Sequence, residues 1–393
     1  MRQDRQLRRR ILCFLHSFEP GGVEGAAFRL CRQWHADGAR VVVAIGRGDG
    51  APGVDPALRL VLAPRTRLPV TAAETLWMIL WLPFVIRRLR PDVLFCAGNS
   101  YAIVAVAMKL LLGRRCPPVV AKISNDLVRH DLPWPARSFY RLWCRVQGQM
   151  FDRVVAMSPA MAAEVRWQMG VPGERLTTIA SPVLDGPRRA ALRQAGERAA
   201  ASRGPGRRFL AAGRLVAQKD FATLIAGFGR AARPCDTLVI LGEGPERQRL
   251  ERQVAALGLV DRVSLPGHAG DVAPWLARAD LLILSSRYEG VPAVVVEAMA
   301  AGLPVIATDC CASMGALLGD GAFGRLVPVG DAIALGEAIA AACPLPGPDE
   351  AAIRAAAAHG VIESARAYLA LIARLGRRAP RSAPRRPLAG QPA

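Results

Sequence analysis

The sequence contains few lysines, few aromatic side chains and no long hydrophobic run. Only three of its 52 basic residues are lysine, and Phe, Trp and Tyr together make up 6% of its 393 residues. No aromatic residues are interleaved with the arginine clusters, which argues against a surface that stacks nucleic-acid bases. The longest apolar runs are Leu76–Ile86, which Pro83 interrupts, and Ala102–Leu112, which Lys109 interrupts. Both are shorter than the roughly 20 apolar residues needed to cross a bilayer.

Several motifs of other protein classes are also missing. No Cys-x-x-Cys pair occurs among the nine scattered cysteines, so we expect reduced thiols and no disulfide or zinc framework. No Asp-x-Asp occurs, so nothing indicates a carboxylate pair that grips Mn²⁺ or Mg²⁺, and we expect neither a metal nor another cofactor. Walker A, Gly-x-Ser-x-Gly and His-Glu-x-x-His are absent too. These absences argue against P-loop nucleotide hydrolases, serine hydrolases and zinc proteases.

The amino-terminal residues and the net charge bear on location and partners. Met1–Arg10 is basic, but the following apolar stretch, Ile11–Leu15, is too short for the core of a signal peptide. We therefore expect a cytoplasmic protein. The net charge of +20 favours anionic partners, of which a membrane surface fits the sequence better than nucleic acid. A solvated, arginine-rich surface is an equally good explanation of the charge.

The order of apolar segments predicts the fold class. A hydrophobic content of 52% with 21% charged residues is typical of a globular protein, and 393 residues favour two domains. Short apolar strands alternate with helical segments twice along the chain, which predicts two doubly wound α/β domains with parallel sheets. The predicted parts are a first domain at 11–185, a linker around 181–207, a second domain at 204–345, a last helix at 349–375 and a disordered tail at 379–393.

The strongest candidate site lies in the segment Ser285–Ala301. A predicted strand ends in a loop that contains Glu289, and Pro292 stands where a helix would begin. The free N–H groups of a helix start attract a diphosphate, and Glu289 and Glu297 can accept hydrogen bonds from hydroxyls at its two ends. An ion pair with an arginine, or exposure to solvent, is the alternative explanation of Glu297. The candidate ligand-binding residues of this segment are Glu289, Gly290, Val291, Pro292 and Glu297.

A second candidate is the loop after the predicted strand Arg208–Ala212. Arg214 and Lys219 stand on this loop. The loop follows a strand of the same predicted sheet, so both cations would lie at its carboxyl edge, where they can neutralise a diphosphate without a metal. The alternative is that they are ordinary charges of a solvated loop.

Two glycine turns complete the candidate site. Gly21 and Gly22 follow the first predicted strand, where paired glycines permit close approach of the backbone to a ligand, or merely a tight turn. In the second domain Gly242-Glu243-Gly244 follows another predicted strand. This turn either borders the nucleotide, with Glu243 beside it, or is an ordinary strand-to-helix turn.

Together these residues resemble family 4 of the retaining glycosyltransferases, also called glycosyltransferase group 1, whose fold is GT-B, with two Rossmann-like domains facing a central cleft. The resemblance implies that Arg214 and Lys219 bind the diphosphate of a nucleotide-sugar donor. It implies that Glu289 orients the transferred sugar and that Glu297 holds the ribose. The glycine loop of the first domain would approach the sugar and phosphates, and the last helix would return to the first domain.

The chain departs from the family at one position. Many members carry a His, often followed by Asp, after the strand that is here Val119–Ile123, whereas this chain has Asn125-Asp126. Asn125 can hydrogen-bond a sugar but cannot act as a base, and we do not expect His130 to be catalytic. The family is usually described by same-face attack, in which the leaving phosphate oxygen accepts the proton of the acceptor. The catalytic candidates are accordingly Glu289, Arg214, Lys219 and Asn125.

The resemblance predicts a metal-independent transferase of the hexosyltransferase type, acting in cell-surface polysaccharide biosynthesis. It would move a sugar from a UDP- or GDP-sugar to a glycan or lipid-linked acceptor. A nucleotide-sugar epimerase of the same fold and a non-enzymatic nucleic-acid-binding protein are the alternatives. The segment Leu76–Ile86, followed by Arg87 and Arg88, fits an interfacial helix at the inner face of the cytoplasmic membrane. Taken separately, each of these features is explained somewhat better by a core helix with a basic end.

Overall fold

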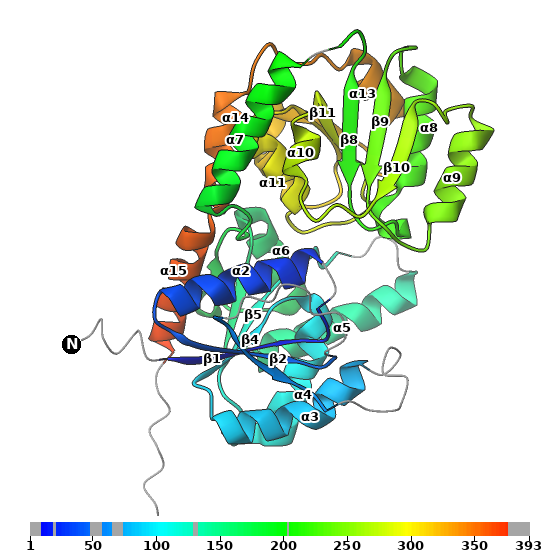
Figure 1. The fold of residues 1–393 in the computed structure, drawn as a ribbon. Helices are drawn as coiled ribbons and strands as arrows, with labels where there is room; N and C mark the ends of the chain where they lie inside the picture. Colours follow the sequence, from blue (N-terminus) through cyan, green and yellow to red (C-terminus); the bar gives the residue numbers. More distant parts are fainter. Residues whose placement is uncertain are drawn as a thin grey trace, which may run out of the picture.

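The computed structural model describes residues 9–18, 21–47, 57–64, 74–128, 133–202 and 204–375. Within them the chain forms two α/β domains, one above the other in Figure 1, each built on a parallel sheet. The predicted fold class is therefore confirmed. The tail at 379–393 and His130 lie outside the described residues. Among the helices described, none has the length and apolar character needed to span a membrane.

The first sheet has seven strands in the order β3-β2-β1-β4-β5-β6-β7. Its central strand β4 is buried along its whole length, because helices cover both faces of a doubly wound sheet. Strand β3 at the edge was not predicted: it is short and half-exposed, so its apolar pattern is weak. The strands are β1 (Arg10–Leu15), β2 (Arg40–Ile45), β3 (Arg59–Leu62), β4 (Val93–Cys96), β5 (Val119–Lys122), β6 (Arg153–Ala156) and β7 (Leu176–Thr178).

The second sheet has six strands in the order β10-β9-β8-β11-β12-β13, again all parallel. Strands β8 and β11 pair at its centre, so the loops that follow them lie side by side. The strands are β8 (Arg208–Ala212), β9 (Thr237–Leu241), β10 (Val263–Gly267), β11 (Leu281–Leu284), β12 (Val305–Thr308) and β13 (Gly324–Val327).

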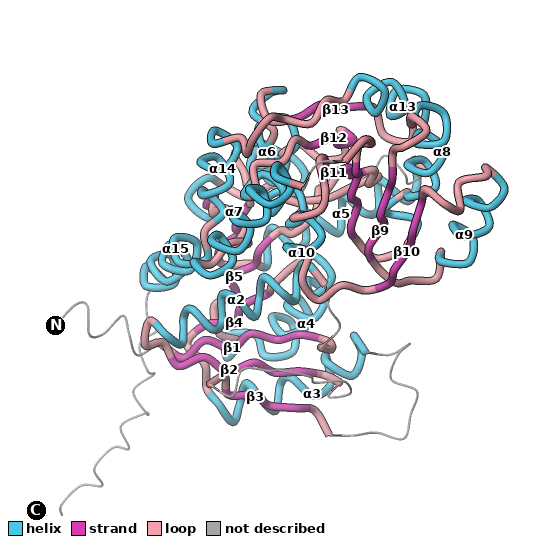
Figure 2. The backbone as a smooth tube through the Cα atoms, turned by 45° about the horizontal axis from the view of Figure 1, so that its top comes forward, coloured by secondary structure: helices cyan, strands magenta, loops and turns pink. Residues whose placement is uncertain are grey.

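Helices surround both sheets (Figure 2). Side-chain caps fix several of their starts, for example Ser158 before α6 and Asp185 before α7. The first domain contains α2 (Gly22–Ala36), α3 (Glu74–Leu89), α4 (Ala102–Leu112), α5 (Trp134–Met150) and α6 (Pro159–Met169). The later helices are α7 (Gly186–Ala201), α8 (Phe221–Ala231), α9 (Arg247–Ala256), α10 (Ala273–Leu276), α11 (Ala293–Ala300), α12 (Met314–Leu317), α13 (Ala332–Ala341), α14 (Glu350–Ala356) and α15 (Val361–Arg374).

The segments that connect the domains are more regular than the sequence suggested. Most of the predicted linker at 181–207 forms α7, whose Leu192 is fully buried in the core of the second domain. The predicted last helix is two helices: α14 packs on the second domain, and α15 lies beside α2 of the first (Figure 1). Tyr368 of α15 makes edge-on ring contacts with Trp34 and Phe95 in the first core. The chain therefore begins and ends its described part in the same domain.

Candidate active site

The loops at the carboxyl ends of the two sheets meet each other. The Asp126 N–H, after β5, donates to the carbonyl of Glu289, after β11, at 3.1 Å. The Ala312 N–H donates back across the domains to Asp126 Oδ2 at 2.8 Å. Ser158 and Ser313 share a further hydrogen bond of 2.7 Å. These contacts bring together the predicted site segments around Asn125 and Glu289, which lie 164 positions apart in the sequence.

Glu289 is held by its own loop and by the neighbouring one. The residue is 8% exposed, and its Oε1 accepts a hydrogen bond of 2.8 Å from Ser286 Oγ. The same oxygen forms an ion pair with Lys219 Nζ. Thr308 Oγ1 in turn donates to the carbonyl of Ser286 at 2.6 Å, which fixes the loop. Sequence analysis predicted Glu289 and Lys219 separately, and it missed Ser286, which orients the carboxylate.

Arg214 lies on the same loop as Lys219 but is free. It is exposed, and it has no ion-pair or side-chain hydrogen-bond partner among the described residues. The residue before it is a glycine for a steric reason, because a Cβ on Gly213 would lie 3.0 Å from Cε of Lys219. The loop therefore presents one cation paired with Glu289 and one cation without a carboxylate.

Helix α11 begins where the sequence predicted, with Pro292 as its N-cap residue. Gly290 stands at the closest approach of the domains, since a Cβ there would lie 2.1 Å from the carbonyl oxygen of Ser124. The next side chain, Val291, packs against the hydrophobic cores of both domains. Gly290 and Val291 thus join the domains in this structure, beside the start of α11.

Glu297 has the arginine partner that the alternative explanation required. Its Oε1 accepts hydrogen bonds from Arg188 Nε at 3.1 Å and Nη2 at 2.7 Å, and Arg188 also pairs with Asp271. Its other oxygen, Oε2, makes no hydrogen bond with the described residues. Sequence analysis missed Arg188, because it lies on α7 within the predicted linker.

The first domain contributes Asn125 and Asp126 beside the Glu289 loop. The carbonyl of Asn125 accepts a hydrogen bond of 3.3 Å from Asn99 Nδ2, while its own side-chain amide has no partner among the described residues. Burial, and then the charge of Glu164, raise the pKa of Asp126 to about 7. Asn125 is thus an unengaged amide next to a carboxyl group that is easily protonated.

Packing within the chain explains the glycine in one of the two turns but not in the other. At Gly22, the first residue of α2, a Cβ would meet nothing within 4 Å, so no close contact inside the chain requires glycine there. Gly242 has φ of +143°, and a Cβ on it would lie 1.9 Å from the carbonyl oxygen of Gly213. Close packing of two loops therefore accounts for Gly242. The exposed carboxylate of Glu243 pairs with Arg247 one turn along the chain.

Metal-binding groups are not gathered in this part of the molecule. Among the residues described, no group of three or more His, Cys, Asp or Glu side chains is placed to hold a metal ion. Besides Arg214, Lys219 and Arg188, the cations near candidate residues include two that sequence analysis missed, Lys122 and Arg29.

Two family models match the chain. "Glycosyltransferase Family 4" matches residues 20–183, and "Glycosyl transferases group 1" matches residues 206–343. The lipopolysaccharide core biosynthesis glycosyltransferase LpsE of Rhizobium meliloti is 36% identical over 127 residues, 32% of this chain and 36% of that protein. The amylovoran biosynthesis glycosyltransferase AmsD of Erwinia amylovora is 31% identical over 103 residues, 26% of this chain and 29% of that protein. These matches span about a third of each relative.

Solved structures match over nearly the whole chain. Anabaena HepE in complex with UDP and glucose has a TM-score of 0.71 at 19% identity, covering 93% of this chain and 100% of that one. WaaG, a glycosyltransferase involved in lipopolysaccharide biosynthesis, has a TM-score of 0.70 at 18% identity, covering 92% and 99%. At these identities the likeness concerns the fold. With both family models matched in order along the chain, the protein belongs to glycosyltransferase family 4, group 1, and has the GT-B fold.

Proposed function

We propose that this glycosyltransferase moves a hexose from a UDP- or GDP-sugar to a glycan or lipid-linked acceptor, with retention at the anomeric carbon and without a metal. The observation that carries the proposal is the loop pair after β8 and β11, where Lys219 binds Glu289 and Arg214 remains free. The relatives named for lipopolysaccharide and amylovoran biosynthesis support cell-surface polysaccharide as the product. UDP in the HepE structures supports a nucleotide donor.

The proposed chemistry is stabilisation of the departing diphosphate. Arg214, the remaining N–H groups of Lys219 and the start of α11 would carry the charge that develops on the leaving phosphate oxygen. Glu289, paired with Lys219, would accept hydrogen bonds from the sugar hydroxyls. Oε2 of Glu297 would accept one from the ribose. Asn125 would bind the sugar from the first domain, and the phosphate oxygen would take the proton of the acceptor.

Domain contact has a role in this chemistry. Gly290 and the Asp126–Glu289 hydrogen bond bring the first domain directly against the donor loops. Closing the cleft in this way would exclude water, which would otherwise hydrolyse the donor. Family membership also weakens the two alternatives, because neither an epimerase nor a nucleic-acid-binding protein is named among the relatives above.

The experiment that tests the proposal is a panel of UDP-, GDP- and ADP-sugars, assayed by thermal shift and by slow donor hydrolysis. We expect stabilisation and hydrolysis with a UDP- or GDP-sugar, undiminished in excess EDTA. Proton NMR of the released sugar would show retention of the anomeric configuration. Absence of binding to every nucleotide would overturn the function, and loss of activity in EDTA would overturn metal independence.

We also propose that the first domain binds an anionic membrane surface, where a lipid-linked acceptor would lie. Leu76, Leu80 and Phe84 follow each other one turn apart on α3, and their exposed fractions are 57%, 56% and 65%. Helix α4 packs against α3 and exposes Leu110 and Leu111. The exposed arginines at these helix ends include Arg87, Arg88, Arg90, Arg114 and Arg115. Apolar side chains rimmed by arginine fit an anionic bilayer interface.

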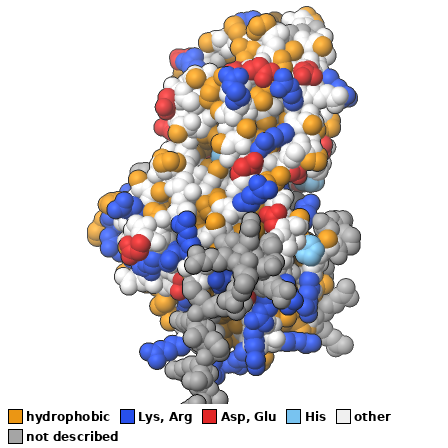
Figure 3. Space-filling view, turned by 90° about the vertical axis from the view of Figure 1, so that its left-hand side faces the viewer, with side chains coloured by type: hydrophobic (Ala, Val, Ile, Leu, Met, Phe, Trp, Pro, Cys, Tyr) orange, Lys and Arg blue, Asp and Glu red, His pale blue; other side chains and the backbone are white. Residues whose placement is uncertain are grey.

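The charge on the first domain is consistent with this surface. On the face drawn in Figure 3, basic side chains are more frequent than acidic ones toward the lower end, which is the first domain. We expect Phe84→Glu to abolish sedimentation with phosphatidylglycerol vesicles at low salt. Leu257→Glu is the control, because Leu257 is 48% exposed on the second domain. Equal sedimentation of both variants would contradict the proposed surface.

A further inference from the structure

Lys122 is a buried cation that the reaction outlined above does not use. It is the last residue of β5 and is 3% exposed. Its side chain makes no hydrogen bond or ion pair with the described residues. A lysine in this situation destabilises the fold, because desolvation of the ammonium is not compensated by a partner. Burial, followed by the charge of Arg29, lowers the pKa of Lys122 to about 8.

The surroundings of Lys122 place it near the contact between the two domains. Three residues further along the chain stands Asn125, beside the Glu289 loop. The charged groups that act on Lys122 are Arg29 and Glu24, both on α2, while its register partner on β6 is Val155. Arg29 is itself subject to the charges of Glu297 and Arg188 across the cleft. Lys122 thus lies near Arg29, and Arg29 lies near charged groups of the second domain.

The carboxylate that acts on Lys122 is already engaged. Arg29 differs, because the charges of Glu297 and Asp185 act on it and its Nε donates to the carbonyl of Pro182 at 2.8 Å. Glu24 Oε1 accepts a hydrogen bond of 2.5 Å from Tyr101 Oη. Its Oε2 folds back over the start of α2, since a Cβ on Gly21 would lie 2.1 Å from it. Glu24 therefore occupies the N-terminal end of a 15-residue helix, where an anion is favoured. Of the two charged groups that act on buried Lys122, the carboxylate of Glu24 is therefore held by Tyr101 and the helix start, and the other is the half-buried cation Arg29.

We propose that Lys122 and Arg29 form the first-domain half of a diphosphate site, so that cations of both domains hold the diphosphate of one ligand. Arg214 and Lys219 would supply the second-domain half. This inference rests on the proposed function, since it assigns a further contact to that cleft. It explains why the fold keeps a buried lysine without a partner: the partner is the ligand. A diphosphate would also draw the domains together across the site.

Lysine side-chain NMR tests the site in the unmodified protein. The chain has three lysines, so ¹³C-lysine labelling gives three signals, which Lys109→Arg and Lys219→Arg assign. We expect the Lys122 signal of the free protein to titrate near pH 8. In saturating UDP its pKa should rise to about 10, the ordinary value of lysine, because a nearby anion favours the charged form. The Lys109 signal, from a lysine paired with Asp152, should not move.

Two sources of a diphosphate are distinguished by the probe. A rise with UDP assigns the site to the donor, and a rise with farnesyl diphosphate alone assigns it to a lipid-linked acceptor. An unchanged Lys122 pKa in saturating UDP and farnesyl diphosphate overturns the inference and leaves the proposed function standing. If no nucleotide binds, the proposed function fails. The Lys122 signal is then measured with inorganic pyrophosphate: a rise in the Lys122 pKa supports the diphosphate site, and an unchanged pKa overturns it.

A pair of lysine variants gives an independent test. Lys122→Met removes the buried charge, so we expect a higher melting temperature together with about tenfold weaker UDP binding, the loss of one charge-assisted hydrogen bond. Lys109→Met breaks the ion pair with Asp152 and should do the opposite: lower stability and unchanged UDP binding. If Lys122→Met is less stable and binds UDP like the unmodified protein, Lys122 has only a structural role.

Discussion

The two ends of strand β8 carry arginines in opposite situations. Arg207 and Arg208, at its start, each have a carboxylate partner of their own, Asp236 and Asp280. Arg214, two residues beyond its end, has none among the described residues. The chain can therefore neutralise an arginine when the fold requires it. Two cations without a partner among the described residues, Arg214 and Lys122, lie at the carboxyl edges of the sheets, where α/β proteins bind ligands.

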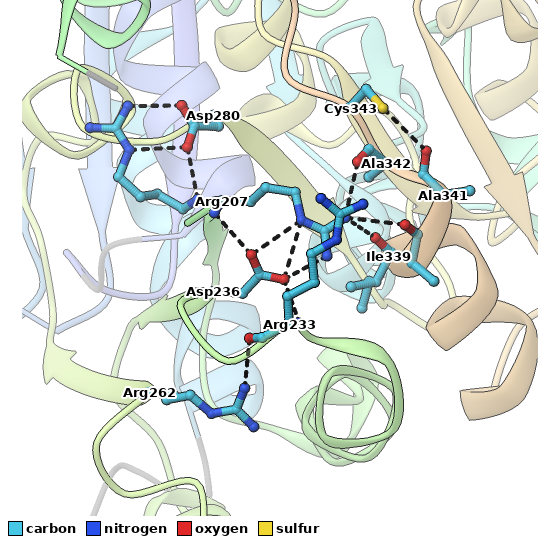
Figure 4. A network of polar contacts seen from close by, with 11 residues as sticks. Arg207, Arg233, Asp236, Arg262, Asp280, Ile339, Ala341, Ala342 and Cys343 are labelled. Carbon is cyan, nitrogen blue, oxygen red and sulfur yellow. Dashed lines mark hydrogen bonds and ion pairs between the residues drawn. The ribbon is translucent and has the colours of Figure 1, made fainter. Parts of the chain in front are cut away.

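The network at the start of β8 shows what a saturated site contains (Figure 4). Arg207 is 5% exposed and Asp236 is 1% exposed. Nε of Arg207 donates to both Asp236 oxygens at 3.2 Å, and Nη1 donates to the carbonyl of Ala342 at 2.9 Å. Burial alone would raise the pKa of Asp236, but the hydrogen bonds from Arg207 lower it. Each guanidinium nitrogen of Arg207 therefore has a hydrogen-bond partner within the protein.

The largest expected effect is a loss of stability at the start of β8, where each arginine has a carboxylate partner. Arg207→Met leaves Asp236 as a buried carboxylate without a counter-charge, so we expect the free energy of unfolding to fall by about 3–5 kcal/mol. Urea denaturation measures it. Arg249→Met is the control: Arg249 pairs with Glu246, its side chain is 64% exposed, and its loss should stay within about 0.5 kcal/mol. A comparably small loss for Arg207→Met would remove the distinction between the two ends.

The opposite change is expected at the other end of the strand. Arg214→Met removes no partner, so the free energy of unfolding should stay within about 0.5 kcal/mol of the unmodified protein. Its kcat/KM for the donor should fall about 100-fold, or about 2.7 kcal/mol, because the charge on the departing diphosphate loses one cation. Arg249→Met serves again as the control, now for activity. Unchanged kcat/KM in Arg214→Met would show that an unpartnered cation at this edge has no ligand.

The same contrast explains what the sequence could and could not predict. Strand positions followed from short apolar runs, and Glu289, Pro292, Arg214 and Lys219 were found because each stands in the loop that follows such a run. Arg188 was missed because its partner Glu297 lies 109 residues further along the chain, and only tertiary structure brings them together. Lys122 was missed for the reverse reason. The sequence places it at the end of an apolar strand but cannot reveal that no carboxylate meets it.

The smallest expected effect concerns two acidic residues, one with a partner of opposite charge and one without. Asp236 is paired with the cation Arg207. Asp126, at the carboxyl edge of the first sheet, instead lies near Glu164 on α6, Asp309 and Cys311. Its pKa is raised to about 7, first by burial and second by the charge of Glu164. An unfolded chain releases this proton near pH 4, so the folded protein holds more protons between about pH 4 and pH 7.

The free energy of unfolding should therefore fall as the pH rises through that range and level off above it. Asp126→Asn keeps an acceptor for the Ala312 N–H and should lower this slope by at most about 1.4 kcal/mol per pH unit, the contribution of one titrating group. Melting temperatures of the variant at a series of pH values measure it. Asp261→Asn, at an exposed position of the second domain, controls for the loss of one acidic residue. A slope that survives in Asp126→Asn would mean that this carboxyl group is ionised when the domains are in contact. The carboxyl edge would then tolerate an unpaired acid as well as unpaired cations, and charge at that edge could no longer be assigned to the ligand alone.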